Sequence, residues 1–348
     1  MISRIRSHNN KPKRRVLGKI LIATLAIVLL VCGAFFLRRL YYKSKHIVKG
    51  KYTDNGGAAS ELTYKGTKYG YNNDIETILL MGLDCVSLDE KPQYEGIETK
   101  GPRSDTMVLL ILDKKKKSVK VLPISRDSMT SIDVFDYSGN YQQTIKEHLC
   151  LQYAFAGGGQ KSGEYASKAV SSLLYSVPID LYCAVDRSTV SELADMVGGV
   201  EVTVLETLYD DDGNVRFTEG ETVTLKGQDA EDYIRLRFKD HSGGNDYRMQ
   251  RQKQFLEAFL GKFTAKIKGR PKELFQAYNK LKKHMQTNVS AWDVLRLGVI
   301  YRKAGRENIE FVAQPGETKL NEAGTHDEFV VDEDSMYELV VKTFYKKK

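Results

Sequence analysis

The feature that most constrains this chain is an uncharged run near its N-terminus, ILIATLAIVLLVCGAFFL at residues 20–37. A helix of this length crosses the hydrocarbon core of a bilayer with little tilt. Basic residues flank the run on both sides, and Arg38 and Arg39 stand where a cleaved signal peptide would have small residues. We therefore predict a retained transmembrane helix at 20–37 rather than a cleaved leader.

This anchor divides the chain into four predicted parts. Residues 1–19 form a short basic tail, residues 38–73 a polar juxtamembrane spacer, and residues 74–348 one folded domain. Basic residues are almost as frequent after the anchor as before it, so the positive-inside rule discriminates weakly. The slight excess of basic residues before the anchor predicts a single-pass cell-membrane protein with its N-terminus inside and its domain extracytoplasmic.

The composition limits which kinds of binding partner are expected but does not select one of them. The chain has a formal net charge of +8, which favours nucleic acid, a membrane surface or phosphate-bearing lipids and polymers. A recognisable nucleic-acid module is missing from the sequence, so we predict a lipid membrane as partner and no nucleic acid. Three cysteines follow the anchor without zinc or redox spacing, and a single disulfide among them stays open: Cys85, Cys150 and Cys183.

Beyond the spacer, short apolar runs alternate with amphipathic segments. TILLMGLD (77–84), TMVLLILD (106–113) and SVKVLPISRD (118–127) predict strands, and the lysine-rich turn before the third predicts a hairpin with the second. Helical periodicity occurs at 163–177 and at 188–197, where Ser188 is a candidate cap. The predicted fold class is α/β, a three-layer α-β-α sandwich around a central mixed β-sheet, preceded by the transmembrane helix.

Charged residues gather at the ends of these strands. Asp84 ends the first strand, Arg103 and Asp105 flank the start of the second, and Arg126 and Asp127 end the third. Sheets of α/β proteins place ligands at strand ends. Magnesium commonly takes one or two carboxylates together with phosphate oxygens and water, so this set suits a magnesium-bound diphosphate.

A second group of basic residues crowds the stretch YIRLRFKDHSGGNDYRMQRQ at 233–252. If YIRLRF is an extended strand, Arg235 and Arg237 project from one face while the apolar residues project from the other. A buried charge without a partner costs several kcal/mol. These arginines must therefore either reach solvent or meet an anion.

The helix that we predict from Asp246 to Lys268 carries the remaining members of this group. Arg248 and Gln252 lie on the same core-facing stripe as the helix's phenylalanines. Backbone N–H groups near a helix start favour an anion, so phosphate fits Arg248 better than a lone carboxylate. A purely structural ion-pair network is the alternative, and Arg251, off the stripe, is predicted to make a surface salt bridge. The stripe continues through Phe255, Phe259 and Phe263.

Taken in order, these motifs resemble the LytR-CpsA-Psr family over residues 75–263. The resemblance implies a membrane-anchored phosphotransferase of Gram-positive-type cells that works outside the membrane. Such an enzyme takes wall teichoic acid, capsular polysaccharide or a related glycan from a polyprenyl diphosphate carrier, attaches it to peptidoglycan and releases polyprenyl phosphate. The motifs are GLD (82–84), RSDTM (103–107), SRD (125–127), VGGVEVTV (197–204) and YIRLR…RMQRQ (233–252).

The resemblance also implies residue roles. Asp84 and Asp105 would hold Mg²⁺ or Mn²⁺ and would be catalytic together with Arg103 and Arg126; Asp84 is also a candidate base. The residues implied to bind the diphosphate are Arg103, Arg126, Arg235, Arg237, Arg248 and Gln252.

Two departures from the family pattern leave a second hypothesis open. Ser125 stands where the family usually has proline before the Arg-Asp pair, and the nearest proline is Pro123. The family also often has a basic residue shortly after the first aspartate, whereas Cys85, Val86 and Ser87 follow here. The alternative is a non-catalytic polyprenyl diphosphate-binding or regulatory membrane protein.

Overall fold

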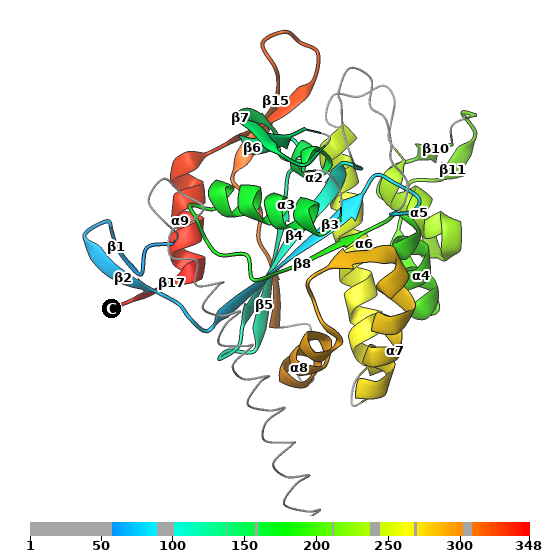
Figure 1. The fold of residues 1–348 in the computed structure, drawn as a ribbon. Coiled ribbons are helices and arrows are strands. Elements are labelled where there is room, and N and C mark those ends of the chain that lie inside the picture. The colour runs from blue at the N-terminus through cyan, green and yellow to red at the C-terminus, as the bar shows by residue number, and fades with distance from the viewer. Residues whose placement is uncertain are drawn as a thin grey trace, which may run out of the picture. The chain divides into compact units, whose positions relative to one another are not determined.

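The computed structural model describes residues 58–88, 101–136, 138–156, 159–210, 212–236, 244–267, 270–301 and 308–348 (Figure 1). The predicted tail, the predicted transmembrane helix at 20–37 and the first part of the predicted spacer lie outside these residues, as does Arg237. Within the described ranges, none of the helices combines the length and the apolar character that crossing a membrane requires.

A mixed sheet forms the centre of the fold. Among the described residues it has six strands, in the spatial order β13 (Met285–Thr287), β8 (Leu181–Val185), β3 (Ile75–Leu83), β4 (Ser104–Asp113), β5 (Ser118–Ile124) and β14 (Ile309–Phe311). Strand β4 pairs antiparallel with both β3 and β5, which confirms the predicted hairpin, whereas β8 runs parallel to β3 and β14 parallel to β5. The predicted central mixed sheet is thus confirmed.

Helices cover one face of this sheet, and the side chains between the sheet and these helices are apolar. The alternating residues Leu79, Met81 and Leu83 of β3 are buried in the larger hydrophobic core. Ala166 and Val170 from α3 pack into the same core, because a strand presents every second side chain to one face and a helix presents every third or fourth. The helices on this face are α2 (Leu151–Phe155), α3 (Gly159–Leu173) and α9 (Glu333–Phe344).

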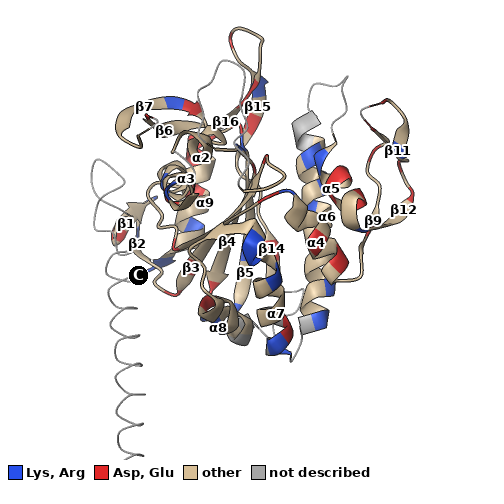
Figure 2. Cartoon of the chain, turned by 45° about the vertical axis from the view of Figure 1, so that its right-hand side comes forward, with Lys and Arg blue, Asp and Glu red and all other residues tan. Residues whose placement is uncertain are grey.

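A second hydrophobic core lies among elements that Figure 2 shows on the opposite side of the sheet. They are α4 (Ser188–Met196), β9 (Val200–Thr203), β12 (Thr222–Leu225), α5 (Gly227–Arg235) and α6 (Gly244–Ile267). Phe255 and Phe259 of α6 are buried there with stacked rings whose centroids are 6.4 Å apart. The predicted phenylalanine stripe of this helix is therefore confirmed.

The remaining elements extend from these layers. Helix α8 (Ala291–Tyr301) is linked to β3 by a hydrogen bond, in which a guanidinium nitrogen of Arg296 donates to a carboxylate oxygen of Glu76 at 2.8 Å. The elements are β6 (Met129–Phe135) with β7 (Tyr141–His148), β10 (Leu208–Tyr209) with β11 (Val215–Phe217), α7 (Pro271–Leu281), the 3₁₀ turn η1 (Lys282–His284), α8 (Ala291–Tyr301), and β15 (Gly316–Leu320) with β16 (Asp327–Val331).

The structure corrects the spacer that we placed at 38–73. Residues of its second half form β1 (Glu61–Tyr64) and β2 (Thr67–Tyr71), and β2 pairs with β17 (Tyr345–Lys347) near the C-terminus. The alternating tyrosines of this polar stretch supply one apolar face, as the ring of Tyr71 packs against that of Tyr345. Folded structure thus begins before residue 74.

Two local predictions also differ from the structure. The condition that YIRLRF is extended does not hold, since Tyr233 to Arg235 form the last turn of α5, where Ala230 and Tyr233 at helical spacing are both buried in the second core. Ser188 does not cap α4; the Asp186 carboxylate accepts the N–H of Thr189 at 3.2 Å instead.

Arg251 joins α5 to α6 in the second core. Its side chain is fully buried, and its Nε lies 3.0 Å from a carboxylate oxygen of Glu206. Its other guanidinium nitrogens donate to the backbone carbonyls of Tyr233 and Leu236. Burial lowers the pKa of Arg251. The predicted salt bridge therefore exists, but the predicted surface position is wrong.

We expect Arg251→Ala to lower the free energy of unfolding by about 3–5 kcal/mol, because removing one partner strands the other charge at a buried site. Urea denaturation followed by circular dichroism measures this loss. The matched control is Arg270→Ala, whose exposed pair with Glu273 contributes less than about 1 kcal/mol. Equal losses of stability in the two variants would contradict a stabilising role of the buried contacts of Arg251.

Candidate active site

The sheet topology brings four charged chain segments to one edge. Strands β3, β5 and β8 end at this edge and the antiparallel β4 begins there. Asp84 follows β3, Arg103 precedes β4, Arg126 follows β5 by two residues, and Arg187 follows β8 by two. Segments that are distant in sequence thus meet because of strand direction alone.

Asp105, near the start of β4, is the centre of this group. Among the described side chains, its carboxylate faces three guanidinium groups. Its Oδ1 pairs with Nη1 of Arg126 and lies 4.0 Å from Nε of Arg103. Its Oδ2 lies 4.0 Å from Nη1 of Arg248. Arg248 is only 5% exposed. Three guanidinium groups thus converge on one carboxylate, and such converging N–H donors suit the oxygens of a phosphate group.

Asp84 occupies the more solvent-exposed part of the same site. Nη2 of Arg103 donates to its Oδ2 at 3.4 Å, and Nη1 of Arg187 lies 3.6 Å from its Oδ1. Arg103 therefore contacts both Asp84 and Asp105, which places the two carboxylates around one cation. The side chains of Asp84, Arg103 and Arg187 are each 30% exposed, against 14% for Arg126.

Backbone hydrogen bonds through Cys150 hold the strand ends in place. The Cys150 carbonyl accepts the N–H of Ser104 at 3.1 Å, and the Cys150 N–H donates to the Arg126 carbonyl at 3.0 Å. Burial raises the pKa of the Cys150 thiol to about 12, so the sulfur stays protonated. Burial acts to lower the pKa of Arg126, but the carboxylates of Asp105 and Asp127 outweigh it and the net pKa is raised. Arg126 therefore stays charged.

Ser125 keeps the turn before Arg126 in shape. Its N–H donates to the side-chain oxygen of Gln314 at 2.7 Å, and its hydroxyl oxygen accepts the N–H of Asp127 at 3.3 Å. Proline at this position could not make the first bond because it has no N–H. Arg126 in turn donates from Nε to Asp127 at 2.9 Å. The serine thus fixes the turn that carries the Arg-Asp pair.

The structure separates the expected arginines of 233–252. Arg248 points into the cluster from α6, and Gln252 follows one turn later, half-buried. Arg235 does not lie on a strand; it ends α5 with its side chain 41% exposed, 3.9 Å from Asp232. Arg237 lies outside the described residues, so its predicted place is untested. Whether these side chains bind a ligand stays a prediction.

Sequence reasoning missed Arg187 and its neighbour Glu231. Arg187 directly follows the strand-like run IDLYCAVD at 179–186, so the strand-end rule that found Asp84 and Arg126 would have found it too. Glu231 lies on α5, 3.6 Å from Nε of Arg187, and no sequence signal distinguishes it from a surface carboxylate.

The donor set suits a hard divalent cation only in part. Among the described residues, no group of three or more histidine, cysteine or acidic side chains is placed to hold a metal ion. Asp84 and Asp105 both contact the Arg103 side chain, which lies between them. Two carboxylates fit an ion such as Mg²⁺ that takes its other oxygens from a phosphate ligand and water.

The sequence matches the LytR_cpsA_psr family model over residues 40–344. The chain belongs to the LytR_cpsA_psr family. Two relatives are the polyisoprenyl-teichoic acid–peptidoglycan teichoic acid transferases TagV of Bacillus subtilis (strain 168) and TagU of Bacillus licheniformis, each 26% identical to this chain. The first match covers 74% of this chain and 64% of TagV; the second covers 91% of this chain and 92% of TagU.

Solved structures agree with the fold of this family member. The crystal structure of B. subtilis TagV aligns with a TM-score of 0.59 at 22% identity, covering 78% of this chain and 98% of that one. A structure described as TagT bound to LI-WTA aligns with a TM-score of 0.54 at 21% identity, covering 78% of this chain and 90% of that one. The mixed α/β fold around a central sheet is thus shared.

We expect Asp105→Asn to lower the free energy of unfolding by about 2 kcal/mol, because the amide leaves the Arg126 and Arg248 guanidinium groups without their shared anion. Thermal unfolding followed by circular dichroism measures the change. Glu317→Gln serves as control, since Glu317 is 68% exposed and pairs only with surface Lys319 in the described residues. A loss no larger than that of the control would contradict this view of Asp105.

Proposed function

We propose that this chain transfers a glycopolymer from a polyprenyl diphosphate carrier to peptidoglycan, forming a phosphodiester link and releasing polyprenyl phosphate. The observation that carries the proposal is the Asp105 carboxylate facing Arg103, Arg126 and Arg248 beside an exposed Asp84. Relatives named as teichoic acid transferases support wall teichoic acid as the glycopolymer, with capsular polysaccharide or a related glycan as the alternatives.

The depth of each arginine suggests its role toward the diphosphate. Arg126 and Arg248 are the more buried, so they would bind phosphate oxygens that have left water. Arg103 is more exposed and contacts both carboxylates, so it would bind at the entrance. Guanidinium groups match phosphate oxygens with paired N–H donors, and their charge is not lost at any physiological pH.

Asp84 and Asp105 would hold the divalent cation, Mg²⁺ or Mn²⁺. When bound, the ion would supply positive charge to the phosphate oxygens and lower the charge repulsion between them and the carboxylates. The fit depends on the convergence of both carboxylates on Arg103.

The reaction joins one oxygen to phosphorus and releases another. A peptidoglycan hydroxyl attacks the sugar-proximal phosphorus, the bond from that phosphorus to the bridging oxygen breaks, and polyprenyl phosphate leaves with the bond's electron pair. Asp84 would accept the hydroxyl proton, since it is the more exposed carboxylate. Arg103 and Arg126 would neutralise the charge on the transferred phosphoryl group, which is the main catalytic contribution in phosphoryl transfer.

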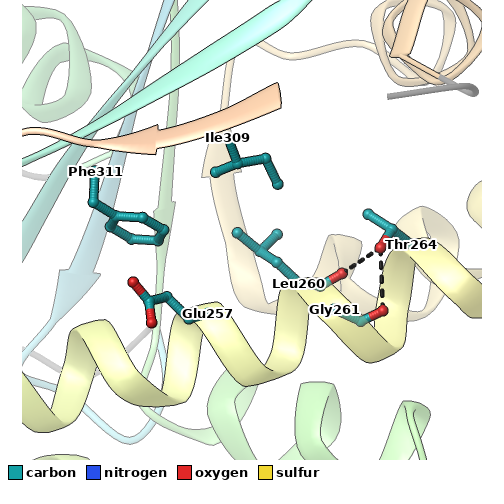
Figure 3. A pocket seen from close by; sticks show the side chains of 6 residues that line it. All are labelled: Glu257, Leu260, Gly261, Thr264, Ile309 and Phe311. Atoms are coloured by element: carbon teal, nitrogen blue, oxygen red, sulfur yellow. Dashed lines mark hydrogen bonds between the residues drawn. The ribbon is translucent and has the colours of Figure 1, made fainter. Parts of the chain in front are cut away.

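The carrier's apolar tail has a candidate place along α6. A hollow of about 210 Å³ lies between this helix and β14, lined by Leu260, Ile309 and Phe311 with Glu257, Gly261 and Thr264 (Figure 3). From Arg248 to Leu260 the helix rises about 18 Å, so a polyprenyl chain of several units leaving the arginine cluster would reach the hollow. A lipid substrate also agrees with the proposed anchor at 20–37 and an extracytoplasmic domain.

The proposal predicts that the detergent-solubilised chain with Mg²⁺, a lipid-linked glycan and peptidoglycan yields a covalent conjugate and free polyprenyl phosphate. Arg126→Ala should reduce the yield at least about 100-fold, because it removes a buried charge aimed at the transferred phosphoryl group. Arg270→Ala should leave it unchanged. Mass spectrometry of both products measures this.

The alternative, a non-catalytic binder of polyprenyl diphosphates, makes a different prediction in the same assay. Such a protein would retain the lipid substrate but release no polyprenyl phosphate. The hydrogen bonds of Ser125, which keep Arg126 and Asp127 in place despite the missing proline, favour the transferase.

Gly261→Leu tests the lipid hollow. A Cβ at Gly261 would meet no atom within 4 Å among the described residues, so leucine fills space without backbone strain. We expect geranylgeranyl diphosphate to bind about tenfold more weakly to this variant, and inorganic pyrophosphate to bind equally well, in isothermal titration calorimetry. Gly261→Ala is the control with a smaller side chain. Equal affinity of all three proteins for the prenylated ligand would place the tail elsewhere.

A further inference from the structure

Arg187 stands at the exposed entrance of the site without an assigned role. It lies between two carboxylates from different elements, with Nη1 3.6 Å from Asp84 and Nε 3.6 Å from Glu231. Both separations exceed the usual N–H···O hydrogen-bond range. Its buried Nε makes no hydrogen bond to any described residue. The guanidinium group is therefore near anions but keeps donors available for a better-placed ligand.

The backbone on both sides of Arg187 is fixed. Its N–H donates to the Cys85 carbonyl at 3.0 Å, which ties it to the residue that follows Asp84. The preceding Asp186 is 2% exposed, accepts the hydroxyl of Ser188 at 2.6 Å and lies 3.0 Å from Nδ1 of His284. Asp186 also donates its backbone N–H to the His284 carbonyl at 3.2 Å. The turn thus sets the direction in which Arg187 leaves the chain.

The segment beside Arg187 lacks positive charge of its own. Cys85, Val86 and Ser87 follow Asp84, and Val86 exposes 56% of its surface although it is apolar. A diphosphate bound to a divalent metal ion at Asp84 would therefore meet no positively charged side chain from residues 85–87. Arg187, held against Cys85, brings a guanidinium group to that place from the β8–α4 turn.

We propose that Arg187 is a diphosphate-binding residue of this chain and supplies, from the β8–α4 turn, the positive charge that residues 85–87 lack. The inference rests on the proposed function. A role as counterion alone fits less well, because it would leave the buried Nε of Arg187 without a hydrogen bond to any described residue. Phosphate oxygens offer paired acceptors to the same donors.

Calorimetric titration of the full chain with geranylgeranyl diphosphate and with inorganic pyrophosphate tests the proposal, with and without Mg²⁺. Arg187→Ala should bind both ligands about tenfold to hundredfold more weakly, the loss expected for charge-assisted hydrogen bonds. Arg187→Lys should fall between this variant and the wild type, because lysine keeps the charge without the paired donors.

Arg216→Ala is the matched control. Arg216 is 35% exposed at its side chain, against 30% for Arg187, and it also pairs with two carboxylates, Asp229 and Asp232. Removing Arg216 breaks surface ion pairs that are comparable to those of Arg187 but lie outside the site. We therefore expect the affinity for diphosphate to stay within about twofold of the wild type. Thermal unfolding checks that each variant is folded, and Arg187→Gln replaces the alanine variant if that one unfolds.

A rescue experiment separates ligand binding from a structural role. In the Arg187→Ala background, Ser87→Arg returns a guanidinium group from the neighbouring segment, which the Cys85 carbonyl holds beside residue 187. Restored affinity supports the proposal, since a side chain on another segment would not repair a lost structural contact. Failure of this variant to regain any affinity counts against Arg187 as the supplier of charge.

The outcomes distinguish this inference from the function on which it rests. If the wild type binds neither ligand, the proposed function fails. If the wild type binds and Arg187→Ala binds equally well, the function survives and the role of Arg187 is overturned. Tighter Mg²⁺ binding by Arg187→Ala with unchanged diphosphate affinity would show that Arg187 is only a counterion of Asp84.

Discussion

The rest of the site depends on the contact between the Asp105 carboxylate and guanidinium groups from three separate segments. Within the described residues these are Arg103 beside the same strand, Arg126 after β5 and Arg248 from α6. Each would be costly to bury alone. The sheet register and the packing of α6 therefore have to be right together, and the guanidinium groups that converge there are what suits the site to a polyanion.

Rigidity around this contact comes from both hydrophobic cores. The larger core fixes the ends of β3, β4 and β5, and Cys150 ties two of those ends to each other through its backbone. The second core fixes α6, where Arg251 joins the helix to the end of α5 through two carbonyls and to the segment after β9 through Glu206. Charges positioned in this way need little reorganisation during a reaction, which fits the phosphoryl transfer that we propose.

Much of this arrangement could be predicted from local pattern. The apolar runs predicted β3, β4 and β5 and the hairpin of the last two, in which Asp105 meets Arg126. The phenylalanine stripe of α6 predicted an inward Arg248. The alternating sequence around Arg235 fits a strand by itself, but the burial of Tyr233 in the second core favours a helix there.

What the sequence by itself determined is the set of strands, the helix stripe and the kinds of side chain at their ends, because periodicity and turn chemistry act over a few neighbouring residues. Only the tertiary structure decided which charges meet: Arg251 pairs with Glu206 inside a core, Arg235 stays at the surface, and Arg187 approaches Asp84. Those outcomes depend on strand order and on helix packing between segments far apart in the chain, and solvation then separates arginines that look alike in sequence.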